Sequence, residues 1–163
     1  DTTYRMQQEE AFLYQCALAV SRDLPVVIHS RESMDLILDI LERELIAGLR
    51  GVFHCFGGTV EEAEAIIDCG FYLGIGGVLT FKRAGLDKTM EKIDLAHVVL
   101  ETDSPYLAPT PFRGKRNESA YLELVAKKLA EIKGMNLVDI ARVTSENAKK
   151  IFVSATKKEF LFG

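Results

Sequence analysis

Three residues with metal-binding side chains stand at or just beyond the ends of short apolar runs. His29 ends the first run, His54 lies near the end of the second, and Asp103 follows the last. Neutral imidazole and carboxylate are suitable ligands for zinc, manganese and similar divalent ions. A pair of such ions could generate hydroxide and hold a phosphoryl or acyl oxygen. A single histidine at the end of a strand is about as often a hydrogen-bonded core residue as a metal ligand. Three candidate ligands at equivalent positions favour a metal site.

Cys55 and His97 also have side chains that can bind metals, but we do not expect them to be ligands. Cys55 directly follows His54, so on a strand its side chain points to the opposite side, and we expect it to pack rather than to bind a metal. His97 stands at the beginning of its apolar run, which in a parallel barrel is the face that serves stability. We therefore expect His97 to be structural.

The segments that must position these side chains alternate between strand and helix patterns. The predicted strands cover residues 24–29, 51–56, 71–75 and 97–101. The predicted helices cover residues 7–23, 33–47, 59–69, 118–133 and 137–152. Gly48 is placed to end the second helix, and Thr59 with Glu62 predicts a capping box at the start of the third.

Strands that alternate with helices in this way predict parallel βα units of an α/β fold. The length of 163 residues favours an open doubly wound sheet, because a (β/α)₈ barrel usually takes ~250 residues. Each predicted strand, however, leads into candidate site residues. An open sheet gathers its ligand only at the switch point, whereas a barrel collects side chains from many strands. This pattern favours half of a TIM (β/α)₈ barrel.

Composition narrows the class of protein further. A net charge of -4, with 48% hydrophobic and 27% charged residues, is typical of a globular domain without a long basic tail. No apolar run approaches the ~20 residues of a membrane span, and no secretion signal opens the chain. The three cysteines are an odd number at wide spacings, which fits neither a disulfide framework nor a structural zinc knuckle. We expect no membrane association and a cytoplasmic location.

A basic loop follows Asp103 and contains Arg113 and Lys115 next to an aromatic residue. Such a cluster could hold phosphates by charge and by bidentate hydrogen bonds. The alternative is a solvated turn, or an ion pair between Arg113 and Glu118 that shapes the loop. Lys82, after the glycine-rich third strand, is a second candidate for phosphate binding with a similar alternative.

Four sequence strings resemble, in order and spacing, the TatD family of metal-dependent deoxyribonucleases. They are LPVVIHSR at 24–31, HCFGG at 54–58, ETDSPYL at 101–107 and RGKRNE at 113–118. The resemblance extends from Asp1 to Phe152, with Thr144 and Asn147 matching the family's terminal Thr-x-x-Asn pattern.

The resemblance implies a TIM barrel of the amidohydrolase type, with residues 1–152 as its C-terminal half and 153–163 as a tail. It further implies one or two divalent metal ions (Mg, Mn or Zn) and hydrolysis of phosphodiester bonds in DNA, with RNA as the other candidate substrate. His29, His54 and Asp103 would be the metal ligands, and Asp103 would also take a proton from water. Glu101, on the same strand face as Asp103, would orient a ligand or form a buried ion pair.

The chain departs from the family pattern at its beginning. The first-strand His-x-His pair is absent, and so is the glutamate that precedes the aspartate matched by Asp1. We therefore expect an N-terminal half of the barrel to be missing, and the chain alone to be a weak metal binder and a poor nuclease. Two other functions stay open: an amide, lactone or aminoacyl-ester hydrolase on the same scaffold, and a non-catalytic remnant that only binds.

Overall fold

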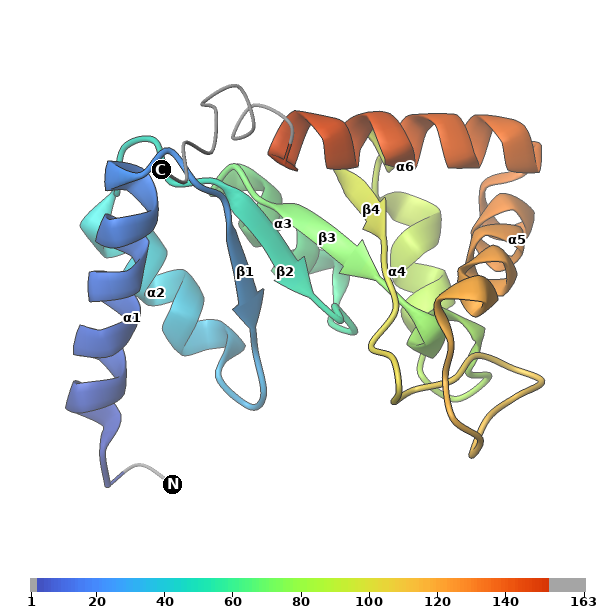
Figure 1. Ribbon diagram of the computed structural model, residues 1–163, viewed down its shortest axis with the longest axis horizontal. Coiled ribbons are helices and arrows are strands. Elements are labelled where there is room, and N and C mark those ends of the chain that lie inside the picture. Colours follow the sequence, from blue (N-terminus) through green and yellow to red (C-terminus); the bar gives the residue numbers. More distant parts are fainter. Residues whose placement is uncertain (1–2, 153–163) are drawn as a thin grey trace, which may run out of the picture.

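Four short parallel strands form one sheet in which they lie side by side in chain order, β1-β2-β3-β4 (Figure 1). The computed structural model describes residues 3–152. The strands are β1 (Val26–His29), β2 (Gly51–His54), β3 (Tyr72–Ile75) and β4 (Val98–Leu100). The helices are α1 (Arg5–Ser21), α2 (Met34–Glu44), α3 (Val60–Asp68), α4 (Leu86–Lys92), α5 (Leu122–Lys133) and α6 (Leu137–Phe152), with short 3-10 helices η1 (Gly77–Thr80), η2 (Leu95–His97) and η3 (Ser119–Tyr121). Helices separate successive strands, which confirms the predicted βα units.

The ends of several elements differ from the prediction. β1 begins at Val26, because the N–H of Leu24 still donates to the carbonyl of Ala19 and closes the end of α1. The prediction that Gly48 ends the second helix is wrong. α2 ends at Glu44, since Leu45 takes a left-handed conformation with φ 42°.

The ends of α3 and α6 follow the sequence signals closely. Thr59 Oγ1 accepts from the N–H of Glu62, and the Glu62 carboxylate accepts from the N–H of Thr59, so the predicted capping box is confirmed. α6 reaches the end of the sheet where the strands begin, and there the buried Asn147 amide donates to the carbonyls of Leu95 and Val98. These contacts fix the side of the domain opposite the candidate site.

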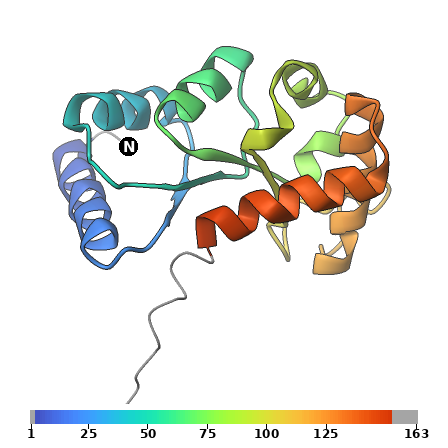
Figure 2. The same cartoon turned by 90° about the horizontal axis from the view of Figure 1, so that it is seen from above.

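The two faces of the sheet are covered unequally. Figure 2 shows α2 and α3 along one face and α6 on the opposite side. The first face carries the main core, in which Phe53 and Leu73 are almost completely buried. On the second face Ile151 of α6 covers Val52, but the strand partner of Val52, Val27, is 60% exposed. This second face, open at β1, is the face that also carries His29 and His54.

His97 lies at the entry end of the sheet, where its ring is 6.3 Å from that of Tyr72. Among residues 3–152 no helix is both long enough and apolar enough to cross a membrane. Asp1 and the predicted tail 153–163 lie outside the described residues.

Candidate metal centre

His29 and His54 lie side by side at the carboxyl end of the sheet. β1 and β2 pair in a register that sets His29 opposite His54, and paired residues of parallel strands point to the same face. The centroids of the two imidazole rings are 5.8 Å apart. The two histidines therefore share one face of the sheet at its carboxyl end.

Glu101 and Asp103 approach the two nitrogens of the His54 ring from opposite sides. His54 Nδ1 is 2.8 Å from Glu101 Oε2, and His54 Nε2 is 3.4 Å from Asp103 Oδ1. The second oxygen of Glu101 accepts from the N–H of Cys55 at 2.9 Å. Because an ionised carboxylate can only accept, Nδ1 carries the proton toward Glu101. The neutral ring then presents the lone pair of Nε2 to Asp103.

The separation between His54 Nε2 and Asp103 Oδ1 fits two ligands of one divalent ion. At 3.4 Å it exceeds the usual N–H···O range, and in a neutral ring of this tautomer both atoms are acceptors. Two ligands with bonds of about 2.1 Å to a tetrahedral ion are separated by roughly 3.4 Å. The carboxylate on the other ring nitrogen is the partner that metal-binding histidines commonly have. The donor set therefore suits a divalent metal ion.

This arrangement supplies only part of a candidate metal centre. Within residues 3–152, no three His, Cys, Asp or Glu side chains converge to form a complete metal cluster as they stand. His54 and Asp103 face each other directly, whereas His29 approaches only with its ring beside that of His54. A complete centre needs movement of His29 or further ligands.

Cys55 does not follow the strand alternation on which its expected position was based. β2 ends at His54, and Cys55 adopts φ 52°, so the chain leaves the strand there. The expectation that strand alternation points its side chain to the side opposite His54 therefore does not apply; Cys55 is partly buried and borders the cavity beside His54. Burial, reinforced by the charges of Glu101 and Asp103, raises the pKa of the Cys55 thiol to about 11. The thiol is therefore protonated and non-nucleophilic at neutral pH.

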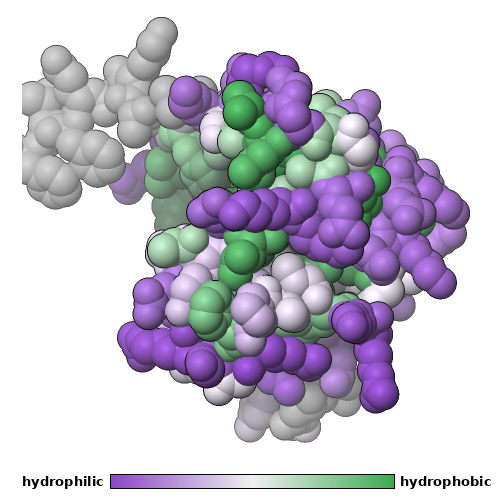
Figure 3. Space-filling model, turned by 90° about the vertical axis from the view of Figure 1, so that its right-hand side faces the viewer, coloured by the Kyte–Doolittle hydropathy of each residue, from purple (hydrophilic) through white to green (hydrophobic). Residues whose placement is uncertain are grey.

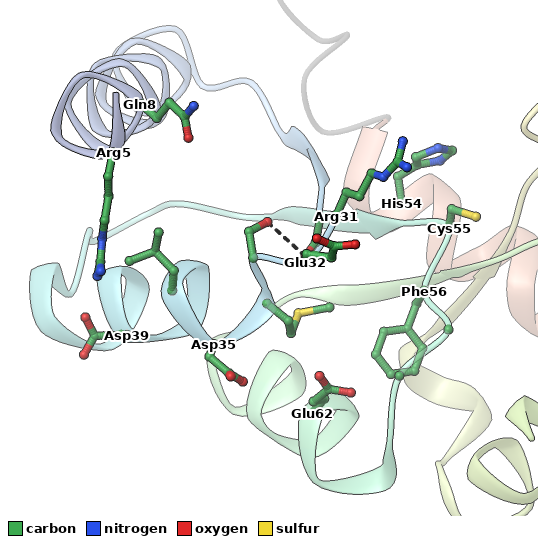
Figure 4. Close-up of a pocket in the computed structure, with 16 residues that line it drawn as sticks. Arg5, Gln8, Arg31, Glu32, Asp35, Asp39, His54, Cys55, Phe56 and Glu62 are labelled. Carbon is green, nitrogen blue, oxygen red and sulfur yellow. Dashed lines mark hydrogen bonds between the residues drawn. The ribbon is translucent and has the colours of Figure 1, made fainter. Parts of the chain in front are cut away.

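An open cavity of about 980 Å³ lies next to His54, between the carboxyl ends of β1 and β2 and helices α1 and α2 (Figure 4). Figure 4 shows His54 and Cys55 at one side and Arg5 near Asp39 at the other. Arg31 also lines it, together with several carboxylates. The cavity provides an open space beside His54.

The basic loop is shaped by aromatic contacts. The guanidinium of Arg113 lies 4.2 Å from the centroid of the Phe81 ring, and Phe112 stacks on Tyr121 with centroids 4.3 Å apart. Among the described residues no ion pair joins Arg113 to Glu118, so the alternative of such a pair is not realised here. Figure 3, which views this end of the molecule, shows hydrophilic side chains over much of the surface with hydrophobic ones between them.

The three cations proposed for phosphate binding are not in contact with the candidate ligands. Lys115 is exposed, and Lys82 lines a separate cavity of about 430 Å³ together with Lys127 and Lys128. In the described part of the chain, no hydrogen bond, ion pair or ring contact joins Lys82, Arg113 or Lys115 to the histidines or Asp103. The structure therefore keeps these three cations apart from the candidate metal ligands.

Sequence reasoning missed Tyr106, an exposed aromatic held close to Asp103. Its N–H donates to the carbonyl of Asp103 at 2.6 Å, and its own carbonyl accepts from the Asn117 side chain at 2.7 Å. The side chain is nevertheless 69% exposed. The signal in the sequence was an aromatic residue three positions after the candidate ligand Asp103, within the string ETDSPYL.

Comparison with known proteins matches the whole described domain to one family. The family model described as TatD related DNase matches residues 1–153. An uncharacterized metal-dependent hydrolase, YabD of Bacillus subtilis strain 168, is 43% identical over 146 residues, which are 89% of this chain and 57% of that protein. A relative from Pantoea ananatis named 3'-5' ssDNA/RNA exonuclease TatD is 38% identical over 152 residues, covering 90% of this chain and 58% of that protein.

Solved structures agree on the fold. The crystal structure of YJJV, a TatD homologue from Escherichia coli K12, matches with a TM-score of 0.87 and 30% identity, covering 94% of this chain and 59% of that one. A TatD family hydrolase from Entamoeba histolytica matches with a TM-score of 0.77 at 22% identity. The chain thus spans less than two thirds of the length of the proteins it matches. It belongs to the TatD family, and its α/β fold is of the TIM-barrel type found in that family.

Proposed function

We propose that this chain forms part of a cytoplasmic, metal-dependent hydrolase that cleaves phosphodiester bonds in single-stranded DNA or RNA. The observation that carries the proposal is the position of His54, with Nδ1 held by Glu101 and Nε2 facing Asp103 at 3.4 Å. The names of the relatives, metal-dependent hydrolase and ssDNA/RNA exonuclease, support this choice of reaction and substrate.

His29, His54 and Asp103 would hold one or two divalent ions, with magnesium, manganese and zinc as the candidates. When bound, such an ion lowers the pKa of water and stabilises negative charge on phosphoryl oxygens. Glu101 keeps the His54 proton on Nδ1, so that Nε2 stays free to bind. The Asp103 side chain is 36% exposed, and its carboxylate can accept a proton from an attacking water.

The substrate would be held by charge and by stacking outside the metal ligands. Lys82, Arg113 and Lys115 would contact phosphates of the strand, which gives affinity without base preference. Tyr106, exposed beside Asp103, can stack on a base of an unpaired strand. The stacking surface favours single-stranded nucleic acid, because bases inside a duplex are already stacked on each other.

We further propose that residues 1–152 are the C-terminal half of the barrel and that an N-terminal half completes the metal centre. Two observations support this: the chain covers 57% of the Bacillus subtilis relative and 59% of the YJJV chain, and Val27 on the inner face of β1 is 60% exposed. A parallel strand edge and an apolar inner face left open in this way are normally covered within a closed barrel.

The test is a hydrolysis assay with end-labelled single-stranded oligonucleotides and Mg²⁺, Mn²⁺ or Zn²⁺ added in turn. The chain is assayed alone and joined to the part of the Bacillus subtilis relative that it does not match. We expect metal-dependent cleavage by the joined protein, its loss in Asp103→Asn, and little cleavage by the chain alone. Cleavage that survives a chelator or Asp103→Asn would refute the metal site. Hydrolysis of amide or lactone substrates without any cleavage of oligonucleotides would replace the proposed substrate.

A further inference from the structure

The contact between Glu101 and His54 crosses an intervening strand. His54 ends β2, Glu101 follows β4, and β3 lies between these two strands. Gly74 is the residue of β3 at the crossing point. It lies opposite Val99 of β4, and the register of β2 with β3 places it beside His54.

A side chain at this position would occupy the space that the Glu101 carboxylate now fills. A Cβ built on Gly74 lies 2.6 Å from Glu101 Oε2, the oxygen that contacts His54 Nδ1, and 3.0 Å from the carbonyl oxygen of Phe53. Both distances are shorter than normal van der Waals contact. We propose that Gly74 is a positioning residue: it leaves open the path across β3 by which Glu101 reaches His54 and fixes the proton of the imidazole on Nδ1.

The backbone around Gly74 is held on both sides, so a new methyl group cannot be relieved by moving it. The carbonyl of Gly74 accepts from the N–H of Phe56, and the N–H of Glu101 donates to the carbonyl of Ile75. The far end of the Glu101 side chain is the part that can give way. Its displacement would break the bond to His54 and the bond from the N–H of Cys55.

Gly76 offers a matched control on the same strand end. It lies two residues on from Gly74, and a Cβ built there comes no closer than 3.5 Å to any atom of Glu101. Gly76→Ala therefore adds the same methyl group near the same carboxylate without entering its path. A general intolerance of alanine in this segment would affect both variants, whereas loss of the carboxylate position would affect Gly74→Ala alone.

The first measurement is the tautomer of His54, read from the ¹⁵N chemical shifts of its ring in the metal-free full chain. The work is done near pH 8.5, about two units above the ordinary imidazole pKa. A His54→Gln variant identifies the signals among the three histidines. We expect the Nδ1–H form in the wild type and in Gly76→Ala, and a shift toward Nε2–H in Gly74→Ala. An Nδ1–H form that persists in Gly74→Ala, or an Nε2–H form in the wild type, overturns the proposal.

The second measurement is the affinity for Zn²⁺ alone by calorimetry of the metal-free joined protein, in which the added part supplies the missing half of the barrel, and this arm rests on the proposed function. Loss of the partner that orients a metal-binding histidine typically costs 10–100-fold in affinity. We expect that loss in Gly74→Ala, no change in Gly76→Ala, and no further loss when Gly74→Ala is added to Glu101→Ala. A tautomer shift in Gly74→Ala together with no zinc binding by the wild type would support the positioning role and refute the metal function. Zinc binding that is equally strong in wild type and Gly74→Ala would support the metal function and refute the positioning role.

A folding control covers the case in which Gly74→Ala is unfolded. The double variant Gly74→Ala/Glu101→Ala lacks the carboxylate that the new methyl group meets, so we expect its circular dichroism spectrum to be native. If the double variant is also unfolded, the carbonyl of Phe53 is the obstacle and the proposal is wrong.

Discussion

The Nδ1 atom of His54 lies 2.8 Å from Oε2 of Glu101, although the two residues are separated by a complete strand of the sheet. Both side chains are about four-fifths buried, so water competes weakly for this contact. The carboxylate thereby determines which ring nitrogen is free.

Replacing Glu101 by glutamine should weaken metal binding while leaving the shape of the site nearly unchanged. The amide can still reach His54 but lacks the negative charge that strengthens the hydrogen bond to Nδ1, and we expect Zn²⁺ affinity to fall about 10–100-fold. Calorimetry of the metal-free joined protein measures this. Glu64→Gln, an exposed change on α3, is the control and should have no effect. Unchanged affinity in Glu101→Gln would mean that Glu101 has only a structural role.

The three histidines should respond differently to substitution by alanine. His29→Ala and His54→Ala remove candidate ligands and should lower both metal affinity and hydrolysis steeply. His97→Ala, at the opposite end of the sheet beside Tyr72, should change little beyond stability. Metal titration, thermal unfolding and the oligonucleotide assay separate these effects. Equal losses in all three variants would contradict the assignment.

Alkylation of Cys55 in the metal-free protein should depend on pH in the way its raised pKa requires. Since burial and two nearby carboxylates favour the neutral thiol, thiolate appears only as the pH approaches about 11. The reaction rate of an ordinary thiol, of pKa about 8.5, becomes constant above that pH. The rate of Cys55 with iodoacetamide should instead keep rising, about tenfold per pH unit, until the pH nears its own pKa. Mass spectrometry of the peptide that contains Cys55 follows the reaction. A rate that levels off near pH 9 would show that the thiol is not shielded.

Lys115→Ala should weaken binding of single-stranded DNA to the same degree for all base sequences. Each lost phosphate contact should reduce the slope of log affinity against log salt by about 0.7. Arg113→Ala should reduce the affinity and the salt slope in the same way. Because this variant also loses the contact with Phe81, its binding is measured at a temperature at which it is fully folded. Fluorescence anisotropy over a salt titration measures the slope. Arg22→Ala, at the end of α1, is the control, and a base-dependent loss in Lys115→Ala would point to a different role.

Tyr106→Ala should lower affinity for an oligonucleotide but not for an abasic strand of the same length. Stacking on a base contributes about 1–3 kcal/mol, so we expect roughly a 5- to 150-fold loss, with Tyr106→Phe close to the wild type. Tyr14→Ala is a matched control, because Tyr14 on α1 is 70% exposed against 69% for Tyr106. An equal loss on the abasic strand would show that Tyr106 does not stack on bases.

The local sequence determined the elements and the candidate ligands. Short apolar runs predicted all four strands, and apolar residues at helical spacing predicted the main helices. Buried strands and amphipathic helices need these patterns to cover a core. The capping box at Thr59 was likewise predictable, since it involves only residues three apart. His29 and His54 were recognisable because strand ends in parallel sheets gather at one edge.

Contacts between distant segments were decided only by the tertiary structure. The path of Glu101 over Gly74 to His54 depends on strand order and register, which no local pattern contains. Because β2 ends at His54, Cys55 leaves the strand and borders the cavity. The guanidinium of Arg113 lies over the ring of Phe81. Each of these positions is set by packing between residues far apart in the chain, whereas periodicity and capping depend on near neighbours.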